Sequence, residues 1–343
     1  MRILDGATAL ANLRDNPLDR WSAGATKDSE HAASRVFQPS PRIDFDYAGR
    51  RLAAADPVFT MGSCFAREIE RAIKARGGAI LSTGAEIARP EFHDAIGRVR
   101  DDVFNRFTPQ SMRQELEAAF GVLEGWGETA LVFDRPGGNQ VDLNYWPIPN
   151  GDARPAATLV RRQVAQGLVR RAAQARVVVL TLGLIEAWRH RPTGLWANHM
   201  HMKLVARRPE DFELHLLDVD QTLECLEAIL ALLERVHQGE GFDLVITVSP
   251  VPMEATFTGR DVVVANAESK AILRAAAGLF CERHERAHYF PSFEMVQYSP
   301  PKYVWKKDFL HITARGVESI VDLFVDRVYQ PGALAASAAP AAP

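Results

Sequence analysis

Short apolar runs alternate with longer segments of helical periodicity along most of this chain, and this alternation restricts the fold more than any other feature. The clearest runs are "RVVVLTL", residues 176–182, and "LVITV", residues 244–248. Both are almost continuously apolar, as expected for strands that are covered on both faces. Residues 58–61 form a third run, and residues 79–82 and 288–290 form weaker ones. The alternation predicts βαβ units around a largely parallel sheet.

Helical patterns occupy the segments between these runs. After Gly62, the apolar residues Phe65, Ile69 and Ile73 recur every four positions, which is the spacing of one helix face. The final helical pattern begins after Thr313, a suitable N-cap residue. Further helices are expected at residues 158–174, 218–237 and 266–284.

The chain divides into four parts by composition. Residues 1–50 are expected to form an irregular N-terminal extension, and residues 51–328 one α/β domain. Within that domain, residues 85–155 are rich in turn formers around one helical segment, which indicates an insertion or lid. Residues 329–343 end in Ala and Pro repeats and are expected to be a disordered tail.

Charge and cysteine content exclude several classes of protein. The formal net charge of −3 does not suit a nucleic-acid-binding surface. The three cysteines are too far apart for a disulfide framework or a zinc site, so a reducing compartment is expected. The chain has no apolar run long enough to cross a membrane and no pattern of a signal peptide. We therefore expect a cytoplasmic protein without a transmembrane segment.

Two adjacent side chains that are able to act as nucleophiles, Ser63 and Cys64, follow Gly62 where a strand pattern ends and a helix pattern begins. Such a turn presents a side chain at the carboxyl edge of a sheet, beside N–H groups of the helix that can stabilise an oxyanion. The alternative is that Ser63 only caps the helix, because serine is a preferred N-cap residue. A nucleophile also needs a base.

His311 is the best candidate for that base. Asp308 precedes it by three residues in "DFLHIT", just before the last helix. This spacing allows the carboxylate to reach one imidazole nitrogen while the other faces outward, as in a Ser-His-Asp triad.

The motifs together resemble one known family. "GSCFA", residues 62–66, is the motif that gives the GSCFA domain family its name, and that family belongs to the superfamily of SGNH or GDSL-like hydrolases. The likeness spans roughly residues 50–325. Its other blocks are "TLGLIEAW" (181–188), "TVSPVPMEAT" (247–256), "DVVVANAESKAILRAA" (261–276), "YFPSFEMV" (289–296) and "DFLHIT" (308–313).

The resemblance implies a flavodoxin-like, three-layer α/β/α sandwich with a central parallel sheet and a mainly helical or irregular insertion. It also implies that Ser63 is the nucleophile, His311 the base and Asp308 the residue that orients the base. Cys64 then packs behind the nucleophile.

The resemblance further implies an oxyanion hole in which a glycine and an asparagine join the N–H of Ser63. Gly84 is the best candidate for the glycine, with Gly77 and Gly78 as alternatives. The expected asparagine is missing, because the third block reads Gly183-Leu184-Ile185-Glu186. We therefore expect Asn198 to supply the amide, although it also suits a turn.

Several other residues have two interpretations. Glu186 either binds substrate hydroxyls, holds a neighbouring loop or pairs with Arg189, and Ser249 suits the wall of a substrate pocket. Ser269 and Lys270 are interpreted as a pair on a helix face. The zinc-like pattern "HERAH" (284–288) and the alternating histidines of "HMHM" (199–202) lack suitable partners, so no metal is expected.

These expectations define a serine enzyme of acyl chemistry. The first hypothesis is an esterase or deacetylase that acts on an O-acylated carbohydrate or a similar ester, without a cofactor. One alternative is an O-acyltransferase of polysaccharide or glycoconjugate synthesis, which would need an acyl donor such as acetyl-CoA. The other is a carbohydrate-binding protein with weak or lost catalysis. The carbohydrate substrate rests on the family resemblance alone.

Overall fold

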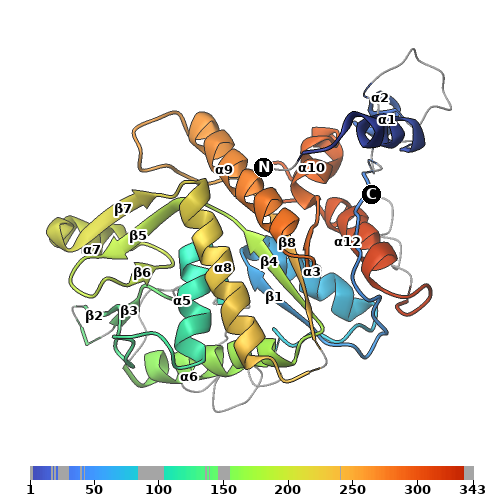
Figure 1. Cartoon of the computed structure of the whole chain (residues 1–343). Coiled ribbons are helices and arrows are strands. Elements are labelled where there is room, and N and C mark those ends of the chain that lie inside the picture. The colour runs from blue at the N-terminus through green and yellow to red at the C-terminus, as the bar shows by residue number, and fades with distance from the viewer. Residues whose placement is uncertain are drawn as a thin grey trace.

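The protein has a parallel sheet at its centre. The computed structural model describes residues 3–16, 18, 21, 31–38, 41, 43–83, 104–135, 137–138, 140–145, 155–239 and 241–335. Its main sheet has the order β1-β4-β8-β9, and all neighbouring strands are parallel (Figure 1). The strands are β1 (Val58–Gly62), β4 (Val177–Leu182), β8 (Asp243–Val248) and β9 (Ala287–Tyr289).

A fifth position flanks β1 on its other side. Ile80 forms a parallel bridge with Val58 there, so the predicted strand at residues 79–82 is reduced to one bridge. Counted in chain order, the sheet positions run 2-1-3-4-5, which is the flavodoxin-like order. Chain order reverses between β1 and β4, and α/β proteins bind ligands at the carboxyl ends of the strands beside such a reversal.

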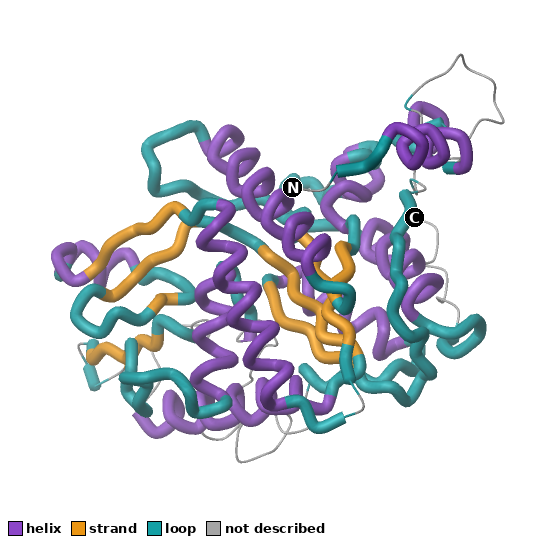
Figure 2. The backbone as a smooth tube through the Cα atoms, viewed as in Figure 1, coloured by secondary structure: helices purple, strands orange, loops and turns teal. Residues whose placement is uncertain are grey.

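Helices cover both faces of the sheet, which confirms the predicted three-layer sandwich (Figure 2). One face packs against α5 (Pro109–Ala119), α8 (Val219–Val236) and α9 (Val262–Arg283). The other face packs against α3 (Cys64–Ala75), α10 (Ser292–Gln297) and α12 (Ala314–Val328).

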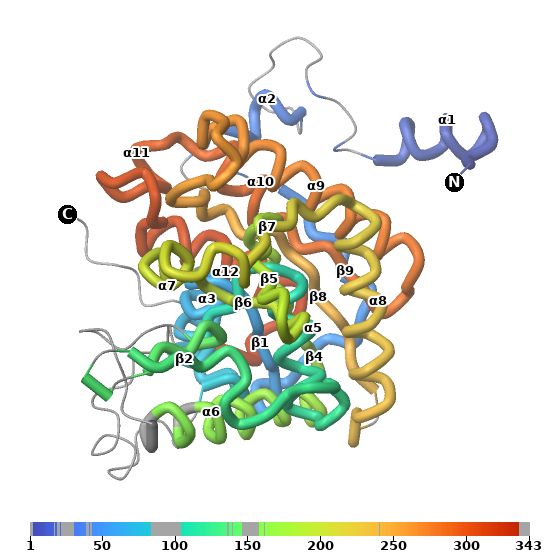
Figure 3. Tube along the Cα trace, turned by 90° about the vertical axis from the view of Figure 1, so that its left-hand side faces the viewer, coloured from blue at the N-terminus to red at the C-terminus, as the bar shows by residue number. Residues whose placement is uncertain are grey.

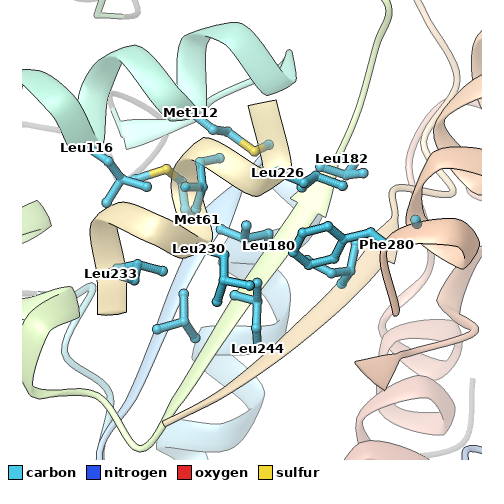
Figure 4. Close-up of a cluster of buried hydrophobic side chains, with 14 of the residues drawn as sticks. Met61, Met112, Leu116, Leu180, Leu182, Leu226, Leu230, Leu233, Leu244 and Phe280 are labelled. Atoms are coloured by element: carbon cyan, nitrogen blue, oxygen red, sulfur yellow. The ribbon is translucent and has the colours of Figure 1, made fainter. Parts of the chain in front are cut away.

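Successive side chains along a strand point to opposite faces of the sheet, so the strands contribute residues to both cores. Met61, Leu180 and Leu244 point toward Leu226 and Leu230 of α8 in the first core (Figure 4). Their neighbours Val58, Val179 and Val245 lie in the second core with Phe65, Ile69 and Ile73 of α3. The four-residue stripe of α3 is therefore buried, as its periodicity predicts.

Part of the predicted insertion is integral to the sandwich. Helix α5 lies within residues 85–155, yet Met112 and Leu116 belong to the first core. The hairpin β2 (Val132–Asp134) and β3 (Gln140–Asp142) packs instead with a small antiparallel sheet of order β6-β5-β7. That sheet comprises β5 (Glu186–His190), β6 (Trp196–Ala197) and β7 (Phe212–Leu216). Residues 84–103 and 146–154 of this region lie outside the described residues.

Other helices connect these layers. They are α2 (Ala32–Arg35), α6 (Pro155–Val169), the 3₁₀ helix η3 (Arg170–Gln174), α7 (Met202–Arg207), the 3₁₀ helix η4 (Pro209–Asp211) and α11 (Pro301–Val304).

The two ends of the chain differ from expectation. Residues 1–50 were expected to be irregular, but Gly6–Asp15 forms helix α1, which Asp5 caps by accepting from the N–H of Thr8 at 2.9 Å. Helix α1 buries none of its residues and lies apart from the sandwich (Figure 3).

Phe45 and Tyr329 are both buried in the second core, at 1% exposure each. The folded part therefore begins before residue 51 and extends past residue 328.

The predicted cap of the last helix is confirmed. Thr313 Oγ1 accepts from the N–H of Gly316 at 3.1 Å. Within the described ranges, no helix is both long and apolar enough to span a membrane.

Candidate active site

Two serines meet at the carboxyl edge of the main sheet. Ser63 follows β1 and Ser249 follows β8, the strands on either side of β4. Their Oγ atoms lie 3.1 Å apart, and the residues are 5% and 1% exposed. The pair thus bridges the end of β4 at the point where chain order reverses, which is where this type of fold forms ligand sites.

Gly62 is required by close packing of the strands. A Cβ atom at this position would lie 2.5 Å from the Cβ of Thr181 on β4. Gly62 is not among the described glycines with positive φ, so no left-handed turn depends on it. Glycine therefore lets β1 approach β4 closely just before Ser63.

The hydroxyl of Ser63 does not cap α3. Ser63 occupies the N-cap position with extended backbone, but its side chain makes no capping hydrogen bond. Its carbonyl accepts from the N–H of Ala66 at 2.9 Å, which is the first bond of the helix. The side chain is thus held at the start of a helix, where N–H groups have no partner within the helix and favour negative charge.

Cys64 is a poor competitor as nucleophile. Burial raises the pKa of its thiol. A thiol with a raised pKa carries little thiolate near neutral pH, and the thiolate is the reactive form.

His311 and Asp308 form a local pair, as predicted from their spacing. Asp308 Oδ2 lies 2.8 Å from Nδ1 of His311, and Oδ1 accepts from the N–H groups of Leu310 and His311 at 3.0 Å each. The N–H of His311, followed by its imidazole, lowers the pKa of Asp308. The carboxylate therefore stays ionised and holds the ring with Nε2 directed away from Asp308.

This pair lies on an exposed hairpin turn. The turn is closed by the bridge between Trp305 and Ile312 and by the bond from Lys306 N to His311 O at 2.8 Å. The side chains of His311 and Asp308 are 52% and 48% exposed.

The hairpin lies at the same end of the molecule as Ser63. Gly78, after α3, lies against Tyr329, after α12, because a Cβ at Gly78 would be 3.3 Å from the Tyr329 hydroxyl. The C-terminal ends of the two packed helices are therefore together, and their N-terminal ends share the carboxyl edge of the sheet. Ser63 is the N-cap of α3, and His311 lies two residues before Thr313, the N-cap of α12. Within the described residues, no hydrogen bond joins these two side chains.

A segment of the predicted insertion crosses this edge. The N–H of Arg106 donates to Gly62 O at 2.8 Å, and the N–H of Leu184 donates to Phe107 O at the same distance. A Cβ at Gly183 would lie 2.7 Å from Phe107 O, so glycine is needed there as well. Residues 105–107 therefore connect the ends of β1 and β4 beside Ser63.

Asn198 holds this crossing segment in place. Its Nδ2 donates to Asn105 O at 2.7 Å, and its Oδ1 accepts from the N–H of Phe107 at 3.1 Å. The residue is 5% exposed. Its amide thus positions the segment next to Ser63, and a direct oxyanion contact by Asn198 stays a prediction.

A buried ion pair anchors the same segment to α5. Arg106 Nη2 lies 2.8 Å from Glu115 Oε2, and both side chains are 2% exposed. The Tyr145 hydroxyl donates to the other oxygen of Glu115 at 2.8 Å. Asn105 beside it is 4% exposed, and its Oδ1 has no hydrogen-bond partner among the described residues. Residues 105–107 were not predicted to lie at the site, because no local pattern in the sequence brings them to β1.

The remaining predicted residues have different surroundings. Gly84 lies outside the described residues. Glu186 accepts from Thr256 Oγ1 at 2.5 Å and from the N–H of Phe257 at 3.0 Å, so it holds the loop between β8 and α9. The alternative partner Arg189 pairs with Glu213 instead, at 3.2 Å.

Ser269 and Lys270 lie on helix α9, as expected, but their burial was not predicted. Both are buried, at 0% and 2% exposure. Ser269 Oγ accepts from the N–H of Ile185 at 3.2 Å, and Lys270 Nζ donates to Gly183 O at 2.8 Å. The signal was available, because Ser269 follows the buried Ala265 by four residues on a helix with an apolar stripe.

The histidine patterns do not form a metal site in the described part of the chain. Helix α9 ends at Arg283 and His288 lies in β9, so His284 and His288 share no helix face. His199 Nε2 lies 2.7 Å from Tyr145 O. The described ranges contain no group of three His, Cys, Asp or Glu side chains that suits a metal ion.

Comparison with known sequences agrees with the extent of this fold. The model of the GSCFA family matches residues 57–324, from the start of β1 into α12. That range contains Ser63, Ser249, Lys270 and the Asp308–His311 turn. No protein among the curated sequences matches the chain.

Proposed function

Because the chain belongs to the GSCFA family, and its matched region contains Ser63, Asp308 and His311, we propose that it is a serine esterase or deacetylase. The observation that carries the proposal is the position of the Ser63 hydroxyl. It lies at the start of α3, free of a capping bond, and the His311–Asp308 pair lies in the turn before α12, the helix that packs against α3.

The proposed reaction has two steps. His311 takes the proton of Ser63 through Nε2 as Ser63 Oγ attacks the ester carbonyl, and the imidazolium then returns the proton to the departing alcohol. Water next attacks the acyl-enzyme with His311 again as base, which releases the acid and restores Ser63. Asp308 stabilises the imidazolium in both steps.

The resting hydrogen bonds must change before the first step. Ser63 Oγ bonds Ser249 Oγ, while His311 sits on an exposed turn. Catalytic hydrogen bonds are often long or missing without substrate and tighten in the complex. The exchange of Ser249 for His311 as the partner of Ser63 is part of the proposed mechanism.

An O-acylated carbohydrate or a similar ester is the proposed substrate. This choice rests on the resemblance of the sequence motifs to the GSCFA family alone. Transfer to a sugar hydroxyl would use the same acyl-enzyme with a different acceptor, and an acyl donor such as acetyl-CoA. Hydrolysis of p-nitrophenyl acetate, measured with and without a sugar acceptor, separates the two. Faster release together with acylated sugar would assign the protein to the transferases.

A binding protein without catalysis is the second candidate. It is favoured by one observation, the absence of a hydrogen bond between Ser63 and His311 in the described part of the chain.

A cytoplasmic location is also proposed, and cell fractionation with an antibody tests it.

A fluorophosphonate probe, followed by peptide mass spectrometry, tests the proposed function. We expect the probe to label Ser63 in the wild type and in Cys64→Ala, and to leave Ser63→Ala unlabelled. Cys64→Ala is the matched control because it changes the adjacent side chain. A folded wild type without label at Ser63 would favour the binding protein.

A further inference from the structure

Lys270 is a buried amine at the edge of the sheet that carries Ser63. It lies on α9, is 2% exposed, and donates through Nζ to Gly183 O and to Val251 O at 2.8 Å each. In the described ranges, no carboxylate forms an ion pair with it. A buried charge without a counter-ion is costly, so an apolar residue here would be easier to accommodate.

The two carbonyls belong to the loops that follow β4 and β8. Gly183 follows β4, whose end the serine pair bridges. Val251 lies two residues after Ser249, the hydrogen-bond partner of Ser63. The Lys270 side chain therefore fixes the position of the Ser249 loop relative to the end of β4.

The charge of the Lys270 ammonium acts on the turn that carries Ser63 and Cys64. Burial lowers the pKa of Lys270 to about 7, while attraction by the thiolate form of Cys64 raises it. Cys64 is adjacent to Ser63, so a negative charge at this turn interacts with the ammonium. The amine is charged below about pH 7 and is neutral above it, and a neutral amine still has two N–H groups for the two carbonyls.

Other charged groups nearby have their own partners or face solvent. Glu186 accepts from Thr256 and Phe257, Glu268 pairs with Arg260, and Glu254 is exposed.

We propose that Lys270 is a positioning residue of the Ser63 site, which clamps the two loops beside Ser63 and, while protonated, stabilises the oxyanion that forms there. This role rests on the proposed serine chemistry. The proposed role has two parts. The hydrogen bonds that clamp the two loops are made by neutral and charged lysine alike, whereas the positive charge is present only in the ammonium form.

The rate of fluorophosphonate labelling of Ser63, measured from pH 6 to pH 9, separates the two contributions. We expect the wild type to exceed Lys270→Met by about tenfold or more at pH 6, where the charge is present. The ratio of the wild-type labelling rate to the Lys270→Met rate should fall as pH rises through about 7. Above that pH it should level off at a value set by the hydrogen bonds of the clamp alone. Lys270→Gln keeps hydrogen-bond donors without charge and should lose the pH-dependent part alone.

Ser269→Ala is the matched control. Ser269 is the neighbouring buried residue on α9, and it holds Ile185 of the same loop through a neutral hydrogen bond. The ratio of the wild-type labelling rate to the Ser269→Ala labelling rate should not change with pH. Thermal unfolding of each variant verifies that it is folded, and Lys270→Gln replaces Lys270→Met if the latter does not fold.

Three outcomes decide the proposal. A ratio that falls with pH for Lys270→Met but not for Ser269→Ala supports it, and a ratio that is constant for both overturns it. If the wild type is not labelled at all, the proposed function fails and alkylation of Cys64 by iodoacetamide decides the role of the charge. Slower alkylation of Cys64, but not of Cys281, in Lys270→Met at pH 6 then supports the charge, because a nearby cation favours thiolate. Equal alkylation rates overturn it.

Discussion

The two ends of the proposed triad lie in opposite environments. Ser63 is 5% exposed, follows a buried strand and depends on residues distant in the chain: Ser249, the crossing segment 105–107 and Lys270. Asp308 and His311 are about half exposed and depend on bonds within their own turn. The proposed nucleophile is thus positioned by tertiary packing and the proposed base by local geometry. Substitutions at the two ends should therefore affect different properties.

The largest effect is expected from Asp308→Asn. The carboxylate fixes the tautomer of His311 and stabilises its imidazolium, so its loss should lower kcat by about 10⁴-fold. Because the turn is local and exposed, the unfolding temperature near neutral pH should fall only slightly, by the contribution of the carboxylate's hydrogen bonds within the turn. Steady-state hydrolysis of p-nitrophenyl acetate and thermal unfolding measure both.

Asp308 also gives a pH-dependent stability. The pKa of Asp308 is lowered in the folded protein, so its stabilising contribution is complete above the unfolded pKa of about 4 and is lost as pH falls below it. The difference in unfolding free energy between wild type and Asp308→Asn should shrink in acid. A difference that grows in acid would contradict the local hydrogen bonds described here.

A smaller loss is expected from Asn198→Ala. This change removes the bonds to Asn105 O and to the N–H of Phe107, and it releases the segment that contacts Gly62. We expect kcat to fall by about 10- to 100-fold, together with a lower unfolding temperature, because one buried amide is lost and two backbone groups are left unpaired.

Asn198→Asp is the matched variant for that change. The aspartate still accepts from Phe107 but cannot donate to Asn105, so an intermediate loss is expected. Unchanged turnover in Asn198→Ala would refute both the positioning role and the predicted oxyanion role of this residue.

Ser249→Ala should have a smaller effect of opposite sign. The Ser249 hydroxyl competes with His311 for the hydroxyl of Ser63. A hydrogen bond of this kind contributes about 0.5–1.5 kcal/mol, so labelling of Ser63 should become about 2- to 10-fold faster. Ser292→Ala, which removes a buried hydroxyl bonded to Thr247 rather than to Ser63, is the control. Labelling slowed by more than tenfold would mean that Ser249 assists the reaction.

The smallest effect concerns Phe309 on the exposed turn. Phe309 has φ of +51° and is 65% exposed, so its side chain contributes little packing while the backbone is strained. Phe309→Gly should raise the unfolding free energy by up to about 1 kcal/mol, because glycine adopts this conformation without the Cβ clash. Urea unfolding measures it, and a loss of more than 1 kcal/mol would show that the ring packs against other residues.

The same contrast explains what the sequence predicted. The runs at β1, β4 and β8 are apolar because both faces are covered, so they were found within one residue at each end. The Asp308–His311 pair and the cap at Thr313 are local, and spacing was enough. The resemblance to the GSCFA family was carried by ordered motifs, and the family match confirms it.

The contacts that long-range packing creates were not predicted. Residues 105–107 reach β1 only because Arg106 pairs with Glu115 on α5 and Asn198 binds the segment from the small sheet. Lys270 was interpreted only as one of a pair on a helix face, because nothing in the local sequence shows that its amine is buried against Gly183 O and Val251 O. Helix α1 was missed because its only strong signal is the cap at Asp5.

The central claim is that Ser63 forms an acyl-enzyme with His311 as its base. It is tested most directly by brief reaction with p-nitrophenyl acetate, an acid quench and peptide mass spectrometry. We expect an acetyl group on Ser63 in the wild type and none on that residue in His311→Ala. Acetylation of Cys64 or Lys270 in place of Ser63, or equal acetylation of Ser63 in His311→Ala, would contradict it.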